Sequence, residues 1–393
     1  MLSAGFFGGG RLRRGLPHHG GMKPPGAVLT PFAIDPEVAR AATIDKRLYL
    51  DHDVWRLALE RVFARSWQWI GDLRDVAAPL ALSPREHLPG SLDEPLLLVR
   101  DAAGRLRCLS NVCTHRGKVI VAAPGRAEPQ GLRCGYHGRR YNLAGRAWFM
   151  PGFDGVADFP CETDHLREVP FAHWRGHGFA AIEPVAPLAE VFAEIDARLP
   201  WLDVERWQPE PSRARSFVFD AHWALYVENY LEGLHIPFLH PGLTQTLDLD
   251  GYTYEQGRWC TLQLARARAD EPAFEPPPGS PEHGQRIAAY SWWVFPNLML
   301  NFYPWGLSLN QVLPLGPAKT RVVFTSYVAD AALLGRGAGG ALDPVEMEDE
   351  AAVLSVQRGI RSRFYGQGRY SPQHERGVHH FHRLLALALG LEE

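Results

Sequence analysis

Two short Cys–His motifs constrain this chain more than any other feature. The first reads C-T-H-R-G and contains Cys113 and His115. The second follows after 18 intervening residues, reads C-G-Y-H-G, and contains Cys134 and His137. Each motif places one thiol and one imidazole on a tight loop that ends in glycine. A fold that uses both motifs has to bring two such loops together around one metal centre.

The composition of this ligand set distinguishes two kinds of metal centre. Zinc fingers usually pair cysteine with cysteine and histidine with histidine. A Rieske [2Fe–2S] cluster instead needs two cysteines on one iron and two histidines on the other, which C-x-H plus C-x-x-H supplies. We therefore predict a cluster and keep zinc as the alternative. We assign the remaining cysteines to ordinary core or surface positions; they are Cys108, Cys161 and Cys260.

Short strands and turns surround the Cys–His motifs. Between about residues 67 and 170 the segments P-L-L-L-V-R-D, R-L-R-C-L-S-N-V and Y-N-L-A-G-R-A-W indicate a small β domain. Before it, Asp53 can cap an amphipathic helix that begins at Val54. We predict a Rieske domain over residues 45–170 and a catalytic domain over 171–393, with residues 31–44 packing on the catalytic domain.

A second motif follows at residues 228–240, which read E-N-Y-L-E-G-L-H-I-P-F-L-H. If a helix begins near Trp223, Glu232 and His235 lie on one of its faces. Pro237 would then kink the helix and could bring His240 toward His235. Two imidazoles and a carboxylate with open positions suit non-haem Fe(II). The chain has 17 histidines, so an ordinary pair of core histidines is the alternative.

Together the two motifs resemble the α subunits of Rieske non-haem iron oxygenases, from about Phe32 to the C-terminus. Within that family the sequence is similar to the choline monooxygenase-like branch. The similar segments are N-Y-L-E-G-L-H-I-P (229–237), P-N-L-M-L-N-F-Y-P-W (296–305), L-P-L-G-P (313–317) and E-D-E-A-A-V-L-S-V-Q-R-G (348–359). The resemblance implies an α+β fold, with a Rieske β domain and a catalytic domain of helices on an antiparallel sheet (START/SRPBCC-like).

The resemblance also implies further site residues. Asp349 matches the third iron ligand, and on a helix it would share an apolar face with Val353, Val356 and Ile360, where a carboxylate needs a partner. Glu232 matches an acid that links a cluster histidine of one subunit to an iron histidine of the next. Asn229 is expected beside the iron, with helix packing as its alternative role. The rival acids, which we expect mostly on solvated faces, are Asp343, Glu346, Glu348 and Glu350.

Aromatic residues of two later strands are candidates for the substrate pocket. An aromatic box can hold a trimethylammonium group by cation–π attraction, or equally an aromatic ring. Packing within the sheet is the alternative for each of these residues, because alternation sends about half of a strand's side chains to the core. The candidates are Trp292, Trp293, Phe295, Phe302, Tyr303 and Trp305.

The activity implied by the resemblance is oxygenation. Electrons from NAD(P)H would reach the [2Fe–2S] cluster and Fe(II) through a separate ferredoxin or flavin reductase, since the chain has no G-x-G-x-x-G fingerprint after a strand. With O2, the enzyme would hydroxylate or oxidatively demethylate a small substrate such as a quaternary amine, as part of a homotrimer. An aromatic-ring hydroxylating dioxygenase is the alternative within the class. An electron carrier and a zinc module are the alternatives outside it.

Composition excludes several other classes. The net charge of −3 and the pI near 6.6 provide no basic surface for nucleic acid. No apolar run approaches the roughly 18 residues of a membrane span. Five cysteines in 393 residues do not make a disulfide framework and suggest a reducing cytoplasm. We expect residues 1–30, which are rich in glycine and contain no acid, to be a disordered tail, and translation could start at Met22.

Overall fold

The computed structural model describes residues 30–240, 242, 247–340 and 342–390. Apart from Thr30, the predicted tail lies outside the described residues. No described helix is both long and apolar enough to cross a membrane.

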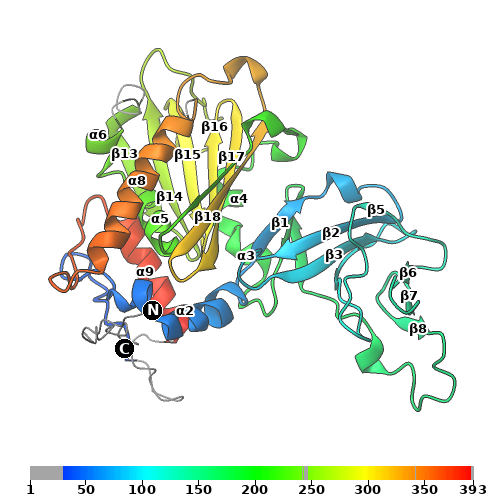
Figure 1. The fold of residues 1–393 in the computed structure, drawn as a ribbon. Helices are drawn as coiled ribbons and strands as arrows, with labels where there is room; N and C mark the ends of the chain where they lie inside the picture. The colour runs from blue at the N-terminus through cyan, green and yellow to red at the C-terminus, as the bar shows by residue number, and fades with distance from the viewer. Residues whose placement is uncertain (1–29, 241, 243–246, 341, 391–393) are drawn as a thin grey trace, which may run out of the picture. The chain divides into compact units, whose positions relative to one another are not determined.

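The Cys–His motifs lie in a β region built from two small antiparallel sheets (Figure 1). Its central strand reads P-L-L-L-V because it is buried on both faces: Leu97 and Val99 enter one apolar cluster, and Leu96 and Leu98 enter another. One sheet has the order β4-β3-β2-β5 and the other β6-β7-β8. The strands are β2 (Ala81–His87), β3 (Glu94–Arg100), β4 (Leu106–Ser110), β5 (Gly125–Arg126), β6 (Leu132–Arg133), β7 (Arg140–Tyr141) and β8 (Ala147–Phe149).

A third sheet pairs a strand that precedes the Cys–His motifs with two strands that follow them. It has the order β1-β10-β9, with β1 at Gln68–Asp72, β9 at Phe171–Trp174 and β10 at His177–Ala180. Two short helices follow, α3 (Leu188–Val191) and α4 (Ala193–Arg198).

The strands after α4 form one eight-stranded antiparallel sheet. Its order is β11-β18-β17-β16-β15-β14-β13, with β12 also paired to β18. Neighbouring strands from β13 to β18 follow one another in the chain, as expected for hairpins. The strands are β11 (Gln208–Pro209), β12 (Arg215–Phe219), β13 (Leu247–Gln256), β14 (Cys260–Ala267), β15 (Ile287–Val294), β16 (Leu298–Tyr303), β17 (Gly306–Gly316) and β18 (Lys319–Val328).

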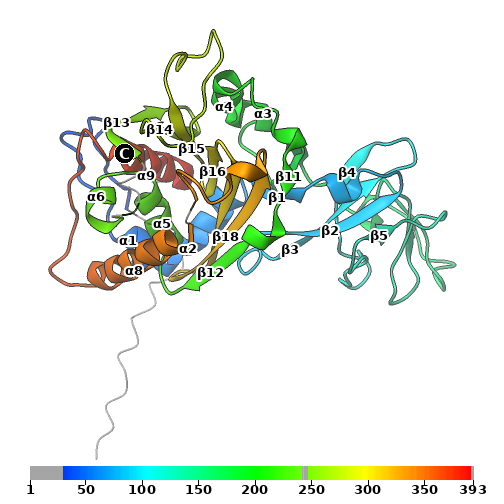
Figure 2. The same ribbon diagram turned by 90° about the horizontal axis from the view of Figure 1, so that it is seen from above.

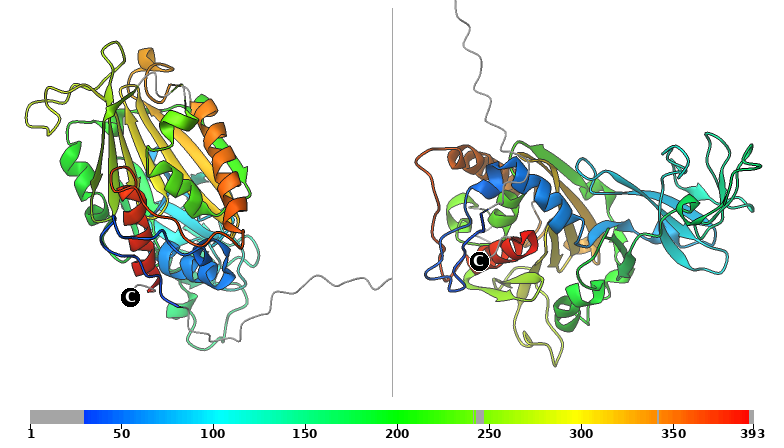
Figure 3. Two further views of the ribbon diagram at one scale, coloured as in Figure 1. Left: turned by 90° about the vertical axis from the view of Figure 1, so that its left-hand side faces the viewer. Right: turned by 90° about the horizontal axis from the view of Figure 1, so that it is seen from below.

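Helices α5 (Trp223–Tyr230), α8 (Leu342–Ile360) and α9 (Arg376–Leu389) cover one face of this sheet, with α6 (Ile236–Leu239) beside them (Figure 2). Green α5 lies between orange α8 and red α9 (Figure 3, left). The other face packs its apolar side chains against α3 and α4. This arrangement confirms the predicted α+β architecture with helices on an antiparallel sheet.

The segment before β1 contacts the helical face. Phe63 packs edge-to-face on Trp223 with 4.8 Å between ring centroids, and the Tyr49 hydroxyl donates to Glu228 at 2.8 Å. Upstream, Ala42 bridges to Arg369. The remaining elements are α1 (Arg47–Leu50), α2 (His52–Ala58), the π-helical η1 (Leu59–Phe63), and the 3-10 turns η2 (Arg74–Val76), η3 (Glu162–Asp164), η4 (Val204–Arg206), η5 (Pro211–Arg213) and η6 (Ala331–Leu333).

Candidate metal centres and active site

The two Cys–His motifs form a matched pair of loops. The N–H of Cys113 donates to the carbonyl of Lys118 at 2.8 Å, and the N–H of Cys134 donates to Arg139 at 2.9 Å. Gly117 and Gly138 have φ values of +70° and +76°, a backbone conformation that glycine adopts without strain. The same turn thus occurs twice, which explains why each motif ends in glycine.

The side chains of these loops converge. The Nδ1 atoms of His115 and His137 lie 3.2 Å apart, and both thiols are buried, with Cys113 and Cys134 each 2% exposed. The Tyr141 hydroxyl lies 3.2 Å from Sγ of Cys113. Two buried sulfurs and two half-exposed imidazoles match the donor set of a Rieske cluster, so the loops fit that group.

The second motif differs from our prediction of one kinked helix. Helix α5 ends at Tyr230, so Glu232 lies in a turn rather than on a helical face. The Glu232 carboxylate folds back to accept from the backbone N–H groups of Leu234 and His235. Pro237 is in the first turn of α6, where its missing N–H costs nothing, so it starts a helix rather than kinking one.

This turn still brings the predicted iron ligands together. Nε2 of His240 lies 2.9 Å from Oδ1 of Asp349, and Nε2 of His235 lies 3.6 Å from the same atom. One donor atom from each of the three residues falls within 4.8 Å of the others. Two imidazole nitrogens and one carboxylate oxygen on one side of a pocket are the donor set of a non-haem Fe(II) site, so the residues fit that ion.

Each of the two imidazoles also has its own carboxylate partner. Nδ1 of His235 lies 2.5 Å from Glu232, and Nδ1 of His240 lies 2.6 Å from Glu348. The amide of Asn229 donates to Asp349 at 3.0 Å. Such contacts fix which ring nitrogen faces the metal. Burial lowers the pKa of His240, but its hydrogen bonds with Asp349 and Glu348 outweigh this effect and raise the pKa above its ordinary value.

Helix α8 also carries acids whose positions differ from those predicted from the sequence. We expected the rivals of Asp349 mostly on solvated faces, yet Glu346 is 5% exposed and accepts from the Tyr226 hydroxyl at 2.5 Å. Burial raises its pKa to about 8. Glu348 contacts His240, as described above. On the expected apolar face, Val353 and Ile360 are buried, whereas Val356 is 48% exposed.

The three candidate iron ligands open onto a pocket of about 750 Å³ between α5, α8 and the sheet. Besides the two histidines, the aromatic side chains among its described lining residues are all tyrosines, and the carboxylates of Glu232 and Asp349 reach it. The described residues that line it are Tyr226, Asn229, Tyr230, Glu232, His235, Ile236, His240, Tyr252, Gln263, Ala265, Ala289, Ser291, Asn301, Tyr303, Ala338, Gly339, Val345 and Asp349. Sequence reasoning missed Tyr226, Tyr230, Tyr252 and Gln263; of these, Tyr230 lies within the second motif, beside Asn229, and that position is the signal that could have found it.

Of the aromatic residues predicted for the pocket, Tyr303 is the one found among the described lining. Strand alternation sends Trp292 and Phe302 to the opposite face, into the large apolar core. Trp293 faces the helices but packs on Phe381 of α9, at 5.2 Å between centroids. Trp305 is 1% exposed and stacks on Tyr303.

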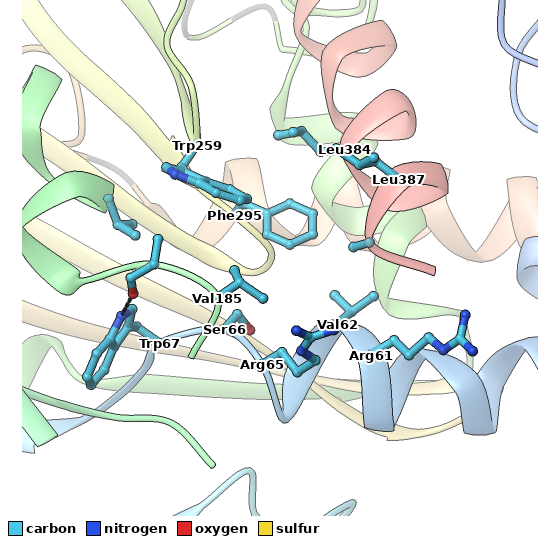
Figure 4. Close-up of a pocket in the computed structure, with 13 residues that line it drawn as sticks. Arg61, Val62, Arg65, Ser66, Trp67, Val185, Trp259, Phe295, Leu384 and Leu387 are labelled. Atoms are coloured by element: carbon cyan, nitrogen blue, oxygen red, sulfur yellow. Dashed lines mark hydrogen bonds between the residues drawn. The ribbon is translucent and has the colours of Figure 1, made fainter. Parts of the chain in front are cut away.

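Phe295 lines a different cavity, of about 780 Å³ (Figure 4). The cavity lies between η1, the end of β15 and α9, and Val62, Trp259 and Leu384 point into it. None of its described lining residues is a histidine, cysteine or acid, so it offers no site for iron. This mostly apolar cavity is separate from the candidate active site.

Comparisons with known proteins agree with this geometry. The sequence model of the Rieske [2Fe-2S] domain matches residues 67–160, and that of the ring hydroxylating alpha subunit (catalytic domain) matches residues 200–390. The first match contains all four predicted cluster ligands, and the second contains the three predicted iron ligands.

Two curated relatives cover most of the chain. It is 30% identical over 375 residues to the chloroplastic choline monooxygenase of Arabidopsis thaliana, covering 89% of this chain and 84% of the relative. It is 29% identical over 375 residues to the carnitine monooxygenase oxygenase subunit of Escherichia coli K12, covering 90% and 95%.

Solved structures show the same fold. A quaternary ammonium Rieske monooxygenase, CntA, superposes with a TM-score of 0.71 at 22% identity, covering 91% of this chain and 97% of that one. Naphthalene 1,2-dioxygenase from a Rhodococcus species gives 0.65 at 19% identity, covering 89% and 94%. With its paired Cys–His loops and its two-histidine, one-carboxylate pocket, the chain belongs to the Rieske non-haem iron oxygenases and is an oxidoreductase of their choline monooxygenase-like branch.

Proposed function

We propose that this oxygenase acts on a quaternary amine, which it hydroxylates or oxidatively demethylates with O2. The observation that carries the proposal is the pocket, in which four tyrosine rings and the Glu232 carboxylate lie beside the candidate iron ligands. Ring faces attract a trimethylammonium group by roughly 0.5–2 kcal/mol per contact. The relatives that share this branch are named for choline and carnitine, both of which carry such a group.

In this proposal the chain holds two metal groups. Cys113, His115, Cys134 and His137 would hold the [2Fe–2S] cluster, and His235, His240 and Asp349 would hold Fe(II). When bound, these groups supply electron storage and O2 activation. The chain's own task is to turn Nε2 of each imidazole toward the metal, which Glu232 and Glu348 do through the Nδ1 atoms, while Asn229 steadies Asp349.

We further propose that the working form is a homotrimer in which Glu232 lies near a neighbour's cluster loops. Large apolar side chains stand exposed at both sites: Tyr136 beside His137 is 58% exposed, and Phe238 between the two iron-site histidines is 85% exposed. Two different patches that cover each other form a head-to-tail contact, which closes into a ring of three where successive subunits are rotated by a third of a turn. The mass in solution, measured by light scattering, tests this assembly.

The source of electrons is a separate reductase in this proposal. Purified protein with NADH alone should then show no turnover, and an added ferredoxin or flavin reductase should restore it. The domain limits, residues 45–170 and 171–393 with 31–44 packed on the latter, and a cytoplasmic location stay predictions.

One experiment tests the proposed reaction. Iron-loaded protein, reduced with dithionite, is mixed with ¹⁸O2 and choline, carnitine or naphthalene. We expect a hydroxylated or demethylated product from an ammonium compound with one ¹⁸O atom transferred to the organic substrate. Product from naphthalene alone, with two ¹⁸O atoms, would contradict the proposal and favour the aromatic-ring dioxygenase.

A further inference from the structure

A buried arginine follows the second Cys–His motif directly. Arg139 comes two residues after His137, and its side chain is 3% exposed. Its Nη1 atom donates to Oγ1 of Thr114 at 2.8 Å, and Thr114 stands between the cluster ligands Cys113 and His115 in the sequence. One cationic side chain from the second cluster loop therefore contacts the first loop.

The same nitrogen atom also pairs with a carboxylate. Nη1 of Arg139 lies 3.1 Å from Oδ1 of Asp164, and the Asp164 carboxylate accepts from the N–H of Cys161 at 2.9 Å. Burial raises the pKa of the Asp164 carboxyl, but hydrogen bonds with Cys161 and the charge of Arg139 outweigh this effect and lower the pKa. Asp164 is therefore an anion at neutral pH, and the two side chains form an ion pair.

This ion pair is shielded from water on the side of Arg139. The guanidinium carbon of Arg139 lies 5.4 Å from the ring centroid of Phe153 and 5.1 Å from that of Phe159, and Nε donates to Sδ of Met150 at 3.3 Å. The Asp164 side chain is 19% exposed. Charges that are shielded from water act more strongly on their neighbours and are screened less by salt.

A chain of contacts leads from the ion pair to a cluster thiol. Oγ1 of Thr114, which accepts from Arg139, lies 3.1 Å from the Tyr141 hydroxyl, and that hydroxyl lies 3.2 Å from Sγ of Cys113. Adding one electron to a cluster held by these loops adds one negative charge beside the ion pair. A nearby cation favours this change and a nearby anion opposes it.

Resting on the [2Fe–2S] cluster of the proposed function, we propose that the Arg139–Asp164 ion pair sets the reduction potential of this cluster, with Arg139 raising the potential and Asp164 lowering it. The electron comes from the separate reductase and leaves for the iron site, and the ion pair itself neither gains nor loses one. Neither side chain touches the substrate, so both act through the cluster and are positioning rather than catalytic residues.

Two single substitutions should move the potential in opposite directions. A redox titration followed by visible absorbance measures the potential on cluster-loaded protein without substrate. Arg139→Met leaves Asp164 unpaired, so we expect the equilibrium constant for one-electron reduction to fall about tenfold, a shift of about 59 mV. Asp164→Asn leaves Arg139 unbalanced, so we expect a rise of about the same size. With both charges removed, the double variant should lie within about threefold of the unmodified protein.

Two further variants are controls. Arg139→Lys keeps the charge and should stay within about threefold of the unmodified protein. Arg146→Met removes an arginine whose side chain is 64% exposed and lies 3.8 Å from Glu162. Because water screens such a surface charge, the reduction constant should again change by less than about threefold. Absorbance and EPR spectra check that each variant holds a cluster.

The outcomes separate this inference from the proposed function. Potentials that stay the same in both single variants, or that move in the same direction, would overturn the inference and leave the proposed function standing. If Arg139→Met holds no cluster, Asp164→Asn decides alone, since an unchanged or lowered potential in it contradicts the inference. A lack of any Rieske-type spectrum in the unmodified protein would overturn the inference and the proposed function together.

Discussion

The cluster loops and the iron site both bring metal-binding side chains together, but the residues they bring together lie at different distances along the chain. Each cluster loop carries its cysteine and its histidine two or three residues apart, on a turn with one repeated hydrogen-bond pattern. At the iron site, His240 and Asp349 are 109 residues apart and meet because α6 and α8 lie over the same sheet face. Local turns hold one donor set, and tertiary packing holds the other. Single substitutions should therefore separate the roles of individual residues more clearly at the iron site than at the cluster loops.

The largest expected effect comes from Asp349→Ala. Removing the one carboxylate that faces both imidazole Nε2 atoms should empty the iron site and lower product formation by roughly a hundredfold or more, while the cluster loops are untouched. Iron analysis and the visible spectrum of the cluster check this. Asp343→Ala, on the same helix but paired with Arg215 at the surface, is the control. Retained turnover in Asp349→Ala would refute the ligand assignment.

Glu232→Gln should slow electron transfer between the two regions. The glutamine keeps the size of the side chain, so both metals should stay bound, but it loses the charge that holds Nδ1 of His235. We expect oxidation of a pre-reduced cluster to slow about 10- to 100-fold in a single turnover followed by stopped flow. Unchanged kinetics would show that Glu232 has no part in linking the two centres.

Glu348→Gln should have a smaller effect, confined to the iron site. His240 would lose its anionic partner, and we expect iron affinity to fall about tenfold, at the low end for such contacts. Dialysis against a chelator measures the loss. Glu350→Gln changes an acid two residues further along α8, which makes no described hydrogen bond to either histidine, and should retain iron like the parent protein. Equal iron loss in both variants would contradict a specific role for Glu348.

The smallest effect concerns His222, which caps α5: its Nδ1 accepts from the N–H of Ala224. Burial lowers its pKa to about 3. Between its ordinary pKa near 6.5 and about 3, the unfolded chain therefore binds one more proton than the folded one, and stability falls with falling pH by about 1.4 kcal/mol per unit. His222→Asn keeps a capping side chain without this proton.

Urea unfolding between pH 5 and 7.5 measures the free energy of unfolding for this comparison. We expect the difference between the variant and the parent protein to shift in the variant's favour as the pH falls. Parallel pH profiles would contradict the assignment of a buried neutral imidazole at position 222.

Much of the fold was predictable because its signals are local. The short strands and turns around the Cys–His motifs indicated the β region, whereas the antiparallel sheet of the catalytic domain was implied by the family resemblance. The end of α5 before Glu232 was not predictable from periodicity, since Pro237 offered a stronger helix-breaking signal seven residues after the actual end. That end is seen only in the fold, where Glu232 turns back onto its own backbone.

The pocket shows most clearly which features of the site could not be predicted from the sequence. Trp292 and Trp293 are adjacent and aromatic, yet one enters the large core and the other packs on Phe381. Tyr252 and Gln263 lie on two other strands and gave no sign in the sequence that they share a cavity with Tyr230. Which face of a strand meets the iron depends on register across the whole sheet, and no single segment encodes it.

The central claim is that one chain holds two different metal groups in these two regions. It is tested most directly by measuring iron and acid-labile sulfide in protein purified without oxygen, with the EPR spectrum of the reduced form. We predict about three irons and two sulfides per chain with a Rieske-type signal. Zinc without sulfide, or two irons and two sulfides that no added Fe(II) raises to three, would contradict the account.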